Sequence, residues 1–121
     1  MALTKTFTVV AANTTMTAAA ANVTSADQDL TTSYEVTVRI RITNGGALGV
    51  AAQVSVQISE DTTAANYTQL ALVKSGDLLT GTVAEYTIQI PDTALHMQFV
   101  SGSNTTNNCT LRIVIDRITG L

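Results

Sequence analysis

Residues 34–43 read YEVTVRIRIT, and this stretch decides the fold class. Apolar side chains occupy every second position, and polar or charged side chains stand between them; the apolar ones are Val36, Val38, Ile40 and Ile42. Successive side chains of a β-strand point to opposite faces of the sheet, so strict alternation is typical of a strand with one buried face. We therefore predict a half-buried strand over residues 34–43.

A second alternating stretch, QVSVQIS at residues 53–59, predicts another strand with Val54, Val56 and Ile58 on its buried side. The loop between the two strands begins with Asn-Gly-Gly at residues 44–46, and these residue types tolerate positive φ angles. We expect the two strands to pair as a hairpin with a loop of several residues.

The same alternation predicts further strands at residues 5–10, 67–74, 84–90, 95–100 and 109–117. Pro91 ends one of them, because proline has no amide donor for a central ladder. In the last strand we expect one face to hold Cys109, Leu111, Ile113 and Ile115. In the first strand we expect Phe7 and Val9 to point inward.

Residues 11–32 are rich in Ala, Asn and Thr, and we predict one irregular strand there, because the alanine run 18–21 is too short for a stable helix. About seven strands without a long amphipathic helix predict an all-β fold, an antiparallel β-sandwich of immunoglobulin-like or jelly-roll-like type. We expect one structural domain, 1–121. It comprises an N-terminal strand and arm over 1–33 and a sandwich core over 34–121.

The composition excludes several functions. Charged residues make up only 12% of the chain, and its six basic residues are scattered, so no basic patch is available for nucleic acid. No apolar stretch of membrane-spanning length occurs, and the first residues do not resemble a signal peptide. We therefore expect no membrane partner, no export by a signal peptide and synthesis in a reducing cytosol. Cys109 is the only cysteine, which excludes an internal disulfide.

No catalytic signature is visible. His96 is the only histidine, and Asp92 and Ser101 are the groups near it that could complete a triad, but their spacing matches no known motif. We interpret His96 as a surface or loop-end residue. Cys109 is in phase with the buried positions of its strand and reads as a small buried hydrophobe. We expect the protein not to be an enzyme.

Four acidic residues form two close pairs in predicted loops, Asp27 with Asp29 and Glu60 with Asp61. A calcium loop needs more oxygen ligands than one such pair supplies, and no EF-hand spacing occurs. We interpret these residues as solvated turn acids and expect neither a metal site nor a cofactor.

Five stretches together resemble the small β-sandwich virion proteins of tailed bacteriophages; they are residues 34–45, 52–61, 86–91, 100–105 and 111–115. The resemblance covers about the last ninety residues and consists of strand rhythm and turn placement. It implies a structural protein that works as a multimer without cofactors. Its partners would be the major capsid protein or neck and tail proteins, and its location the virion, assembled in the host cytoplasm.

Within that class the first expectation is a capsid decoration or auxiliary head protein that stabilises the shell. A neck, tail or fibre-attachment component is the alternative. A carbohydrate-binding or adhesin module is a third reading, favoured by Asn- and Thr-rich loops such as 103–108 and weakened by the few aromatic residues.

The functional surface should then be a sheet face. We expect the candidate interface to comprise outward residues of three strands, namely Thr37, Arg39, Arg41, Gln53, Ser55, Gln57 and Arg112. The first thirty residues are a further candidate, as an arm that reaches a neighbouring subunit.

Overall fold

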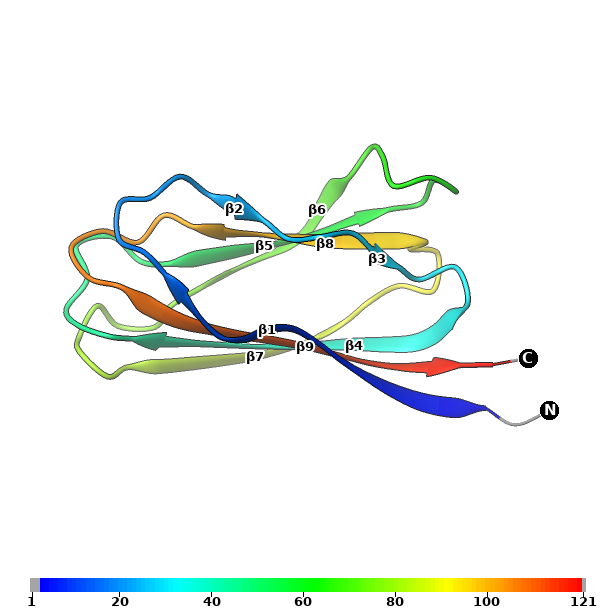
Figure 1. The fold of residues 1–121 in the computed structure, drawn as a ribbon, viewed down its shortest axis with the longest axis horizontal. Helices are drawn as coiled ribbons and strands as arrows, with labels where there is room; N and C mark the ends of the chain where they lie inside the picture. Colours follow the sequence, from blue (N-terminus) through cyan, green and yellow to red (C-terminus); the bar gives the residue numbers. More distant parts are fainter. Residues whose placement is uncertain (1–2, 121) are drawn as a thin grey trace.

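The computed structural model describes residues 3–120, which form two β-sheets packed face to face with no helix between them (Figure 1). The strands are β1 (Thr4–Met16), β2 (Val23–Thr24), β3 (Gln28–Asp29), β4 (Ser33–Asn44), β5 (Gln53–Ser59), β6 (Thr68–Lys74), β7 (Val83–Gln89), β8 (His96–Gly102) and β9 (Cys109–Thr119). No helix in this range could cross a membrane.

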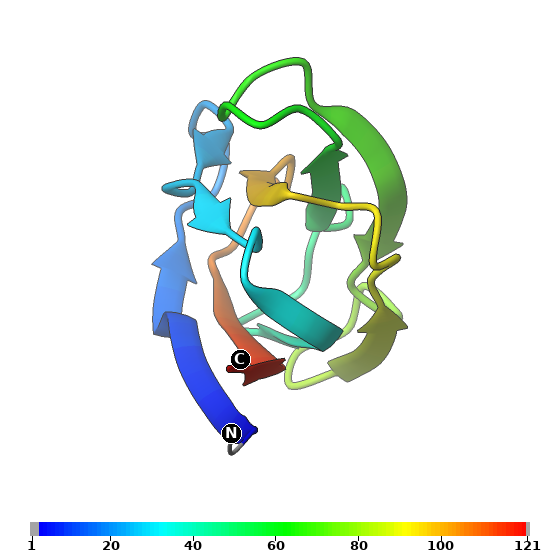
Figure 2. The same cartoon turned by 90° about the vertical axis from the view of Figure 1, so that its right-hand side faces the viewer.

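The first sheet has the strand order β1-β9-β4-β7, and the second has the order β2-β8-β5-β6, with β3 also pairing with β8. Every pair of strands in the described range is antiparallel. Seen from one end, the two sheets enclose a common interior (Figure 2). The predicted antiparallel β-sandwich is confirmed. Seven of the nine strands have seven residues or more, and β2 and β3 have two each.

The core forms where the inner faces of the two sheets meet. Its fully buried side chains come from both layers and include Val38, Ile40, Ile42, Val54, Val56, Met97, Phe99, Ile113 and Ile115. The alternation of β4, β5 and β9 therefore predicted their buried faces correctly. Close packing of β-branched side chains across two sheets is the main source of stability in such a sandwich.

The expected hairpin of β4 and β5 is wrong. Strand β4 pairs with β7 and β9, whereas β5 lies in the other sheet and pairs with β6 and β8. The connection crosses between the sheets and is held by two other loops that make the same crossing. The Gly45 amide donates to Asn108 O at 2.9 Å, and the Leu48 amide donates to Leu78 O at 2.8 Å. A Cβ at Gly45 would lie only 2.7 Å from Asn108 O, so glycine is needed for this approach.

The inward orientation expected for Phe7 and Val9 is also wrong, because 54% of Phe7 and 42% of Val9 are exposed. The cause is the register of β1, which pairs Phe7 with Asp116 and Val9 with Val114, both on the outward side of β9. A strand at a sheet edge takes its facing from the strand it joins, and a shift of one residue reverses every side chain.

Residues 11–32 contain no helix, as expected, but in place of one irregular strand they hold the end of β1 and the two-residue strands β2 and β3. Strand β1 continues to Met16 through two irregularities, and Asn13 has a φ of 55°. The chain then crosses to the second sheet, where β2 and β3 pair with opposite ends of β8. Both termini of the described chain lie near one another at one end of the sandwich (Figure 1).

Candidate interaction faces and a buried histidine cluster

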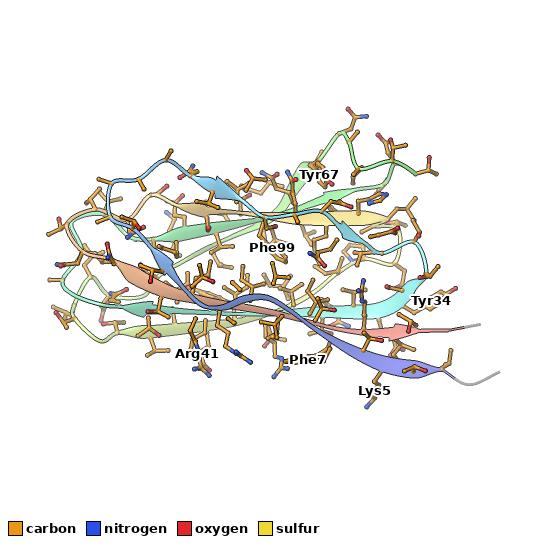
Figure 3. All side chains as sticks on the ribbon, viewed as in Figure 1. Lys5, Phe7, Tyr34, Arg41, Tyr67 and Phe99 are labelled. Atoms are coloured by element: carbon orange, nitrogen blue, oxygen red, sulfur yellow. The ribbon has the colours of Figure 1, made fainter. Side chains whose placement is uncertain are left out.

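The outer face of the first sheet is not covered by any other element of the described chain, and we call it the arginine face. Its side chains are Lys5, Phe7 and Val9 of β1, Arg112, Val114, Asp116 and Ile118 of β9, Thr37, Arg39 and Arg41 of β4, and Glu85, Thr87 and Gln89 of β7. Lys5, Phe7 and Arg41 point away from the sandwich on the same side (Figure 3).

Two ion pairs run across this face. Arg39 Nη2 lies 2.9 Å from Asp116 Oδ2, and Arg41 Nε lies 3.1 Å from Glu85 Oε1. All four side chains are about half exposed, so each pair contributes only about 0.2–1 kcal/mol to stability. Arg112 forms no ion pair within residues 3–120. The pairs therefore orient the guanidinium groups more than they stabilise the fold.

Apolar side chains accompany these arginines. Val114 faces outward yet is only 4% exposed, because Val9 and Arg39 stand beside it on the two neighbouring strands. The half-exposed Phe7 and Val9 continue this apolar strip along β1. Aromatic and arginine side chains around an apolar centre are the composition that distinguishes the centres of protein interfaces.

The predicted interface residues fall on two separate surfaces. Thr37, Arg39, Arg41 and Arg112 lie together on the arginine face. The three arginines help to line a shallow cavity of about 130 Å³ there. Gln53, Ser55 and Gln57 lie on the outer face of the second sheet, on the opposite side of the sandwich. This separation follows from the crossing of the chain between β4 and β5.

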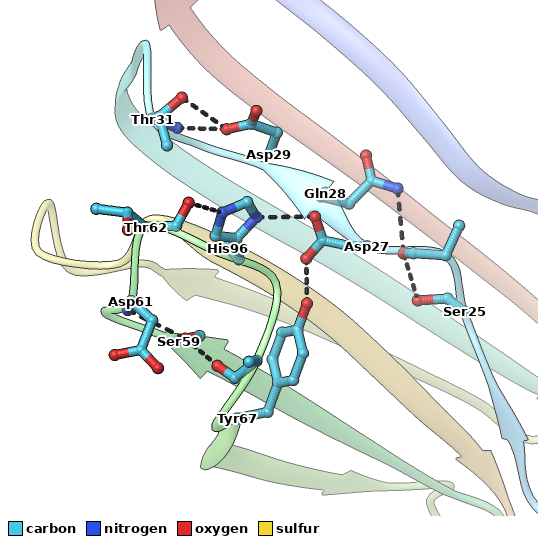
Figure 4. Close-up of polar contacts among 12 residues, drawn as sticks. Ser25, Asp27, Gln28, Asp29, Thr31, Ser59, Asp61, Thr62, Tyr67 and His96 are labelled. Atoms are coloured by element: carbon cyan, nitrogen blue, oxygen red, sulfur yellow. Dashed lines mark hydrogen bonds and ion pairs between the residues drawn. The ribbon is translucent and has the colours of Figure 1, made fainter.

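We expected His96 at a surface or at the end of a loop. It does follow a loop, as the first residue of β8, but it is not at the surface, because only 6% of it is exposed. Its Nδ1 lies 2.8 Å from Asp27 Oδ2, and its Nε2 lies 3.3 Å from Thr62 O. The Tyr67 hydroxyl donates to the other oxygen of Asp27 (Figure 4). These four residues, which we call the histidine cluster, join the segment before β3, the start of β8 and the loop between β5 and β6.

The cluster shifts the pKa values of its members. The hydrogen bond that His96 donates to the Asp27 carboxylate raises the pKa of His96 above its usual value, and this effect outweighs the burial that opposes it. Burial and the Asp27 carboxylate raise the pKa of Tyr67 to about 12. Hydrogen bonds from the Thr31 amide and hydroxyl lower the pKa of nearby Asp29.

The geometry of the histidine cluster indicates a structural role, in which its hydrogen bonds link three segments of the second sheet. Both ring nitrogens of His96 face protein acceptors, so neither is directed at an open site in this arrangement. Asp92 and Ser101, the two partners considered from the sequence, form no hydrogen bond with the His96 ring within residues 3–120. Asp27 is 69 positions away in the chain, and no short-range spacing could have identified it.

The other acidic residues and the cysteine form no further site within the described range. No group of three or more His, Cys, Asp or Glu side chains within residues 3–120 is placed to hold a metal ion. Cys109 is buried, as predicted, with its Sγ 3.7 Å from Asn44 Oδ1. Burial raises the pKa of its thiol, which disfavours the reactive thiolate.

Comparison with known proteins finds structures of similar fold but no protein of similar sequence. No known family model and no curated protein matches the chain. It is similar to a pilus structure from Bacillus endospore appendages, with a TM-score of 0.61 and 10% identity over 97% of this chain and 88% of that one.

A structure of infectious bursal disease virus, Gx strain, gives a TM-score of 0.57 and 9% identity over 97% of this chain and 32% of the viral chain. A carbohydrate-binding module from a glycoside hydrolase of family 9 of Ruminococcus flavefaciens gives a TM-score of 0.56 and 9% identity over 93% of this chain and 97% of the module. At such identities the similarity establishes a β-sandwich shared with pilus, virus and binding-module structures, and no activity.

Proposed function

We propose that this chain is a structural subunit that assembles with other subunits into a shell or filament, and that the arginine face is its docking surface. The observation that carries the proposal is the uncovered outer face of the first sheet, where Phe7, Val9 and Val114 lie among Arg39 and Arg112. Single exposed apolar residues are common on protein surfaces, whereas apolar side chains that are contiguous and bordered by polar ones are typical of interaction sites.

Within this class we propose a virion protein of a tailed bacteriophage, first a capsid decoration or auxiliary head protein and second a neck, tail or fibre-attachment component. The strand rhythm of residues 34–115 and the low content of charged residues support the virion reading. Pilus and virus structures among the fold neighbours support the assembly reading. Its partners would be the major capsid protein or neck and tail proteins, together with further copies of itself.

Docking would gain free energy mainly from apolar surface. About half of Phe7 is exposed, so covering it would remove roughly 100 Å² from water and contribute about 2.5 kcal/mol per copy. Such a contribution is modest for one interface. Many linked copies raise the effective concentration of each contact, and the lattice as a whole becomes stable.

The proposal is tested by isolating the assembled particle or filament from its source and identifying its proteins by mass spectrometry. We expect this chain in many copies. In a binding assay with the purified particle lacking this chain, Phe7→Asp should abolish incorporation. Leu79→Asp is the matched control, since Leu79 is a similarly exposed apolar residue in a loop away from this face.

Absence of the chain from every isolated assembly would overturn the structural role. Equal incorporation of Phe7→Asp and wild type would overturn the assignment of the docking face while leaving the role open to another surface. Thermal melts of both variants establish that each one is folded.

A further inference from the structure

The outer face of the second sheet carries a different chemistry, and we call it the glutamine face. The register of β8, β5 and β6 places its side chains in rows across the sheet. One row is Gln98, Gln57 and Gln69, and the next is Val100, Ser55 and Leu72. Gln53 continues β5 on the same side. Every side chain in these two rows is uncharged.

The amides and the hydroxyl of this face form a directed chain of hydrogen bonds. Gln98 Nε2 donates to Gln57 Oε1 at 2.8 Å, Gln57 Nε2 donates to Ser55 Oγ at 3.5 Å, and Ser55 Oγ donates to Gln69 Oε1 at 2.8 Å. The bonds hold the side chains in fixed orientations and so lower the entropy that ligand binding would cost.

The two ends of this row of hydrogen bonds have donors and acceptors that are free to bind a ligand. Within residues 3–120, no protein partner is bonded to Gln69 Nε2 at one end, to Gln98 Oε1 at the other, or to the amide of Gln53. A primary amide has two donor hydrogens and one acceptor oxygen, so the face presents both donors and acceptors at set positions.

A shallow cavity of about 270 Å³ lies over part of this face. It is lined by Gln53, Gln57, Gln69 and Ser55 together with Asn22, Leu72, Val100, Gly102 and Ser103, and Gln98 lies outside the lining. No charged side chain lines it. Leu72, which is exposed, and the half-buried Val100 supply an apolar strip beside the amides. The volume is below that of a pocket enclosing a whole drug-sized ligand, so it suits one or two units of an extended molecule.

We propose that the glutamine face binds a neutral glycan. Each sugar hydroxyl donates and accepts a hydrogen bond, as each primary amide does, and the C–H face of a sugar ring packs on aliphatic side chains such as Leu72. A polyanion such as nucleic acid would require several cations, and Arg39, Arg41 and Arg112 all lie on the opposite side of the sandwich. On this side Lys74 pairs with Gln53 at the end of β6, but it is a single cation and does not line the cavity. This site is separate from the arginine face and independent of the assembly role.

The test is a titration of the isotopically labelled full chain with neutral hexasaccharides of glucose, xylose and mannose, followed by two-dimensional 15N–1H NMR. Glutamine side-chain amides give their own signals, so binding is seen at the groups that make it. A hexasaccharide of galacturonic acid is the charged comparison. We expect shifts of the Gln57, Gln69 and Gln98 amides with at least one neutral sugar and none with the acidic one.

Gln69→Glu is the sharpest variant, because a glutamate retains the oxygen that accepts from Ser55 but loses the free amide donors. It also adds a negative charge, which the control variant adds as well. We expect binding to weaken about fivefold or more. Gln89→Glu is the matched control, since Gln89 also accepts from a hydroxyl, that of Thr37, but lies on the arginine face. We expect its effect to stay within about twofold.

Three outcomes would overturn the site. No amide shifts with any neutral sugar, or equal affinity of Gln69→Glu and wild type, would exclude glycan binding at this face. Shifts that grow with protein concentration alone would show that a second copy of the chain occupies the face instead. None of these results bears on incorporation of the Phe7→Asp variant, so the two proposals fail separately.

Discussion

Replacing Asp27 with alanine tests whether the histidine cluster holds the end of the second sheet together. Within residues 3–120, Asp27 is the only carboxylate bonded to His96, and it also accepts from the Tyr67 hydroxyl. Its removal therefore leaves a buried imidazole and a phenol without their acceptor. The Thr62 carbonyl would remain as the one partner of the ring.

The expected loss follows from the geometry. A hydrogen bond to a charged group contributes about 1.5–3 kcal/mol, and an unsatisfied buried donor costs a similar amount. The Asp27 side chain is 28% exposed, so water partly replaces it and the lower part of this range applies. We expect Asp27→Ala to lower the free energy of unfolding by about 2 kcal/mol near pH 6, or the melting temperature by roughly 8 °C.

The loss should depend on pH. The folded chain raises the pKa of His96 above its ordinary value of 6.5, so protonation of His96 stabilises the fold. This contribution is complete below about pH 6.5 and is lost as the pH rises through the folded pKa. A neutral ring can donate from only one nitrogen, whereas Asp27 and Thr62 present two acceptors.

At the acid end the nearby Asp29 acts with the opposite sign. Its pKa is lowered from 3.8 by the bonds from Thr31, so its contribution is present above that value and is lost as the pH falls through the folded pKa. From these two groups we expect the wild-type chain to be most stable between about pH 4 and 6.5.

The assay is urea denaturation of wild type, Asp27→Ala and the control Asp92→Asn at intervals from pH 5 to pH 9. Asp92 is an exposed loop aspartate that forms no side-chain bond within residues 3–120. Wild type and control should lose stability above neutral pH. At pH 6, Asp27→Ala should be less stable than wild type, and its free energy of unfolding should vary less with pH. Parallel curves for wild type and Asp27→Ala across the whole range would refute the reasoning.

Three further predictions concern the core and its titrating groups. Phe99→Ala should lower the free energy of unfolding, measured by urea denaturation, by about 3–5 kcal/mol, because Phe99 is fully buried. The same change at the exposed Phe7 should lower it by less than about 1 kcal/mol. Equal losses from the two variants would contradict the burial of Phe99 in the core. Cys109 should react with a maleimide only after unfolding, and rapid native labelling would contradict its burial. The absorbance of Tyr67 phenolate should appear with a midpoint of about pH 12 and shift downward in Asp27→Ala; an unchanged midpoint would argue against the contact.

The sequence predicted what depends on local alternation. The period of two in β4, β5 and β9 identified the buried residues Ile40, Val56 and Ile113, because a pleated strand between core and solvent leaves no other arrangement. The β-sandwich followed from several such strands without helices. Both proposed faces include the outward polar positions of those same strands.

What depends on pairing between strands could not be predicted. The sheet to which β5 belongs is decided by loop contacts such as that of Gly45 with Asn108, 63 positions further along the chain. Phe7 faces outward because of its register with β9, and alternation alone permits either facing. His96 is buried because a segment 69 positions earlier supplies Asp27.

The most direct test of the docking claim measures whether the arginine face is covered in the assembled state. Thr87→Cys places a thiol on this face, and Thr63→Cys places one on an exposed loop between β5 and β6, while the buried native Cys109 stays silent. Maleimide labelling rates are compared between the free chain and the isolated particle or filament. We predict that assembly protects Thr87→Cys and leaves Thr63→Cys reactive. Equal labelling of Thr87→Cys in both states would contradict the claim.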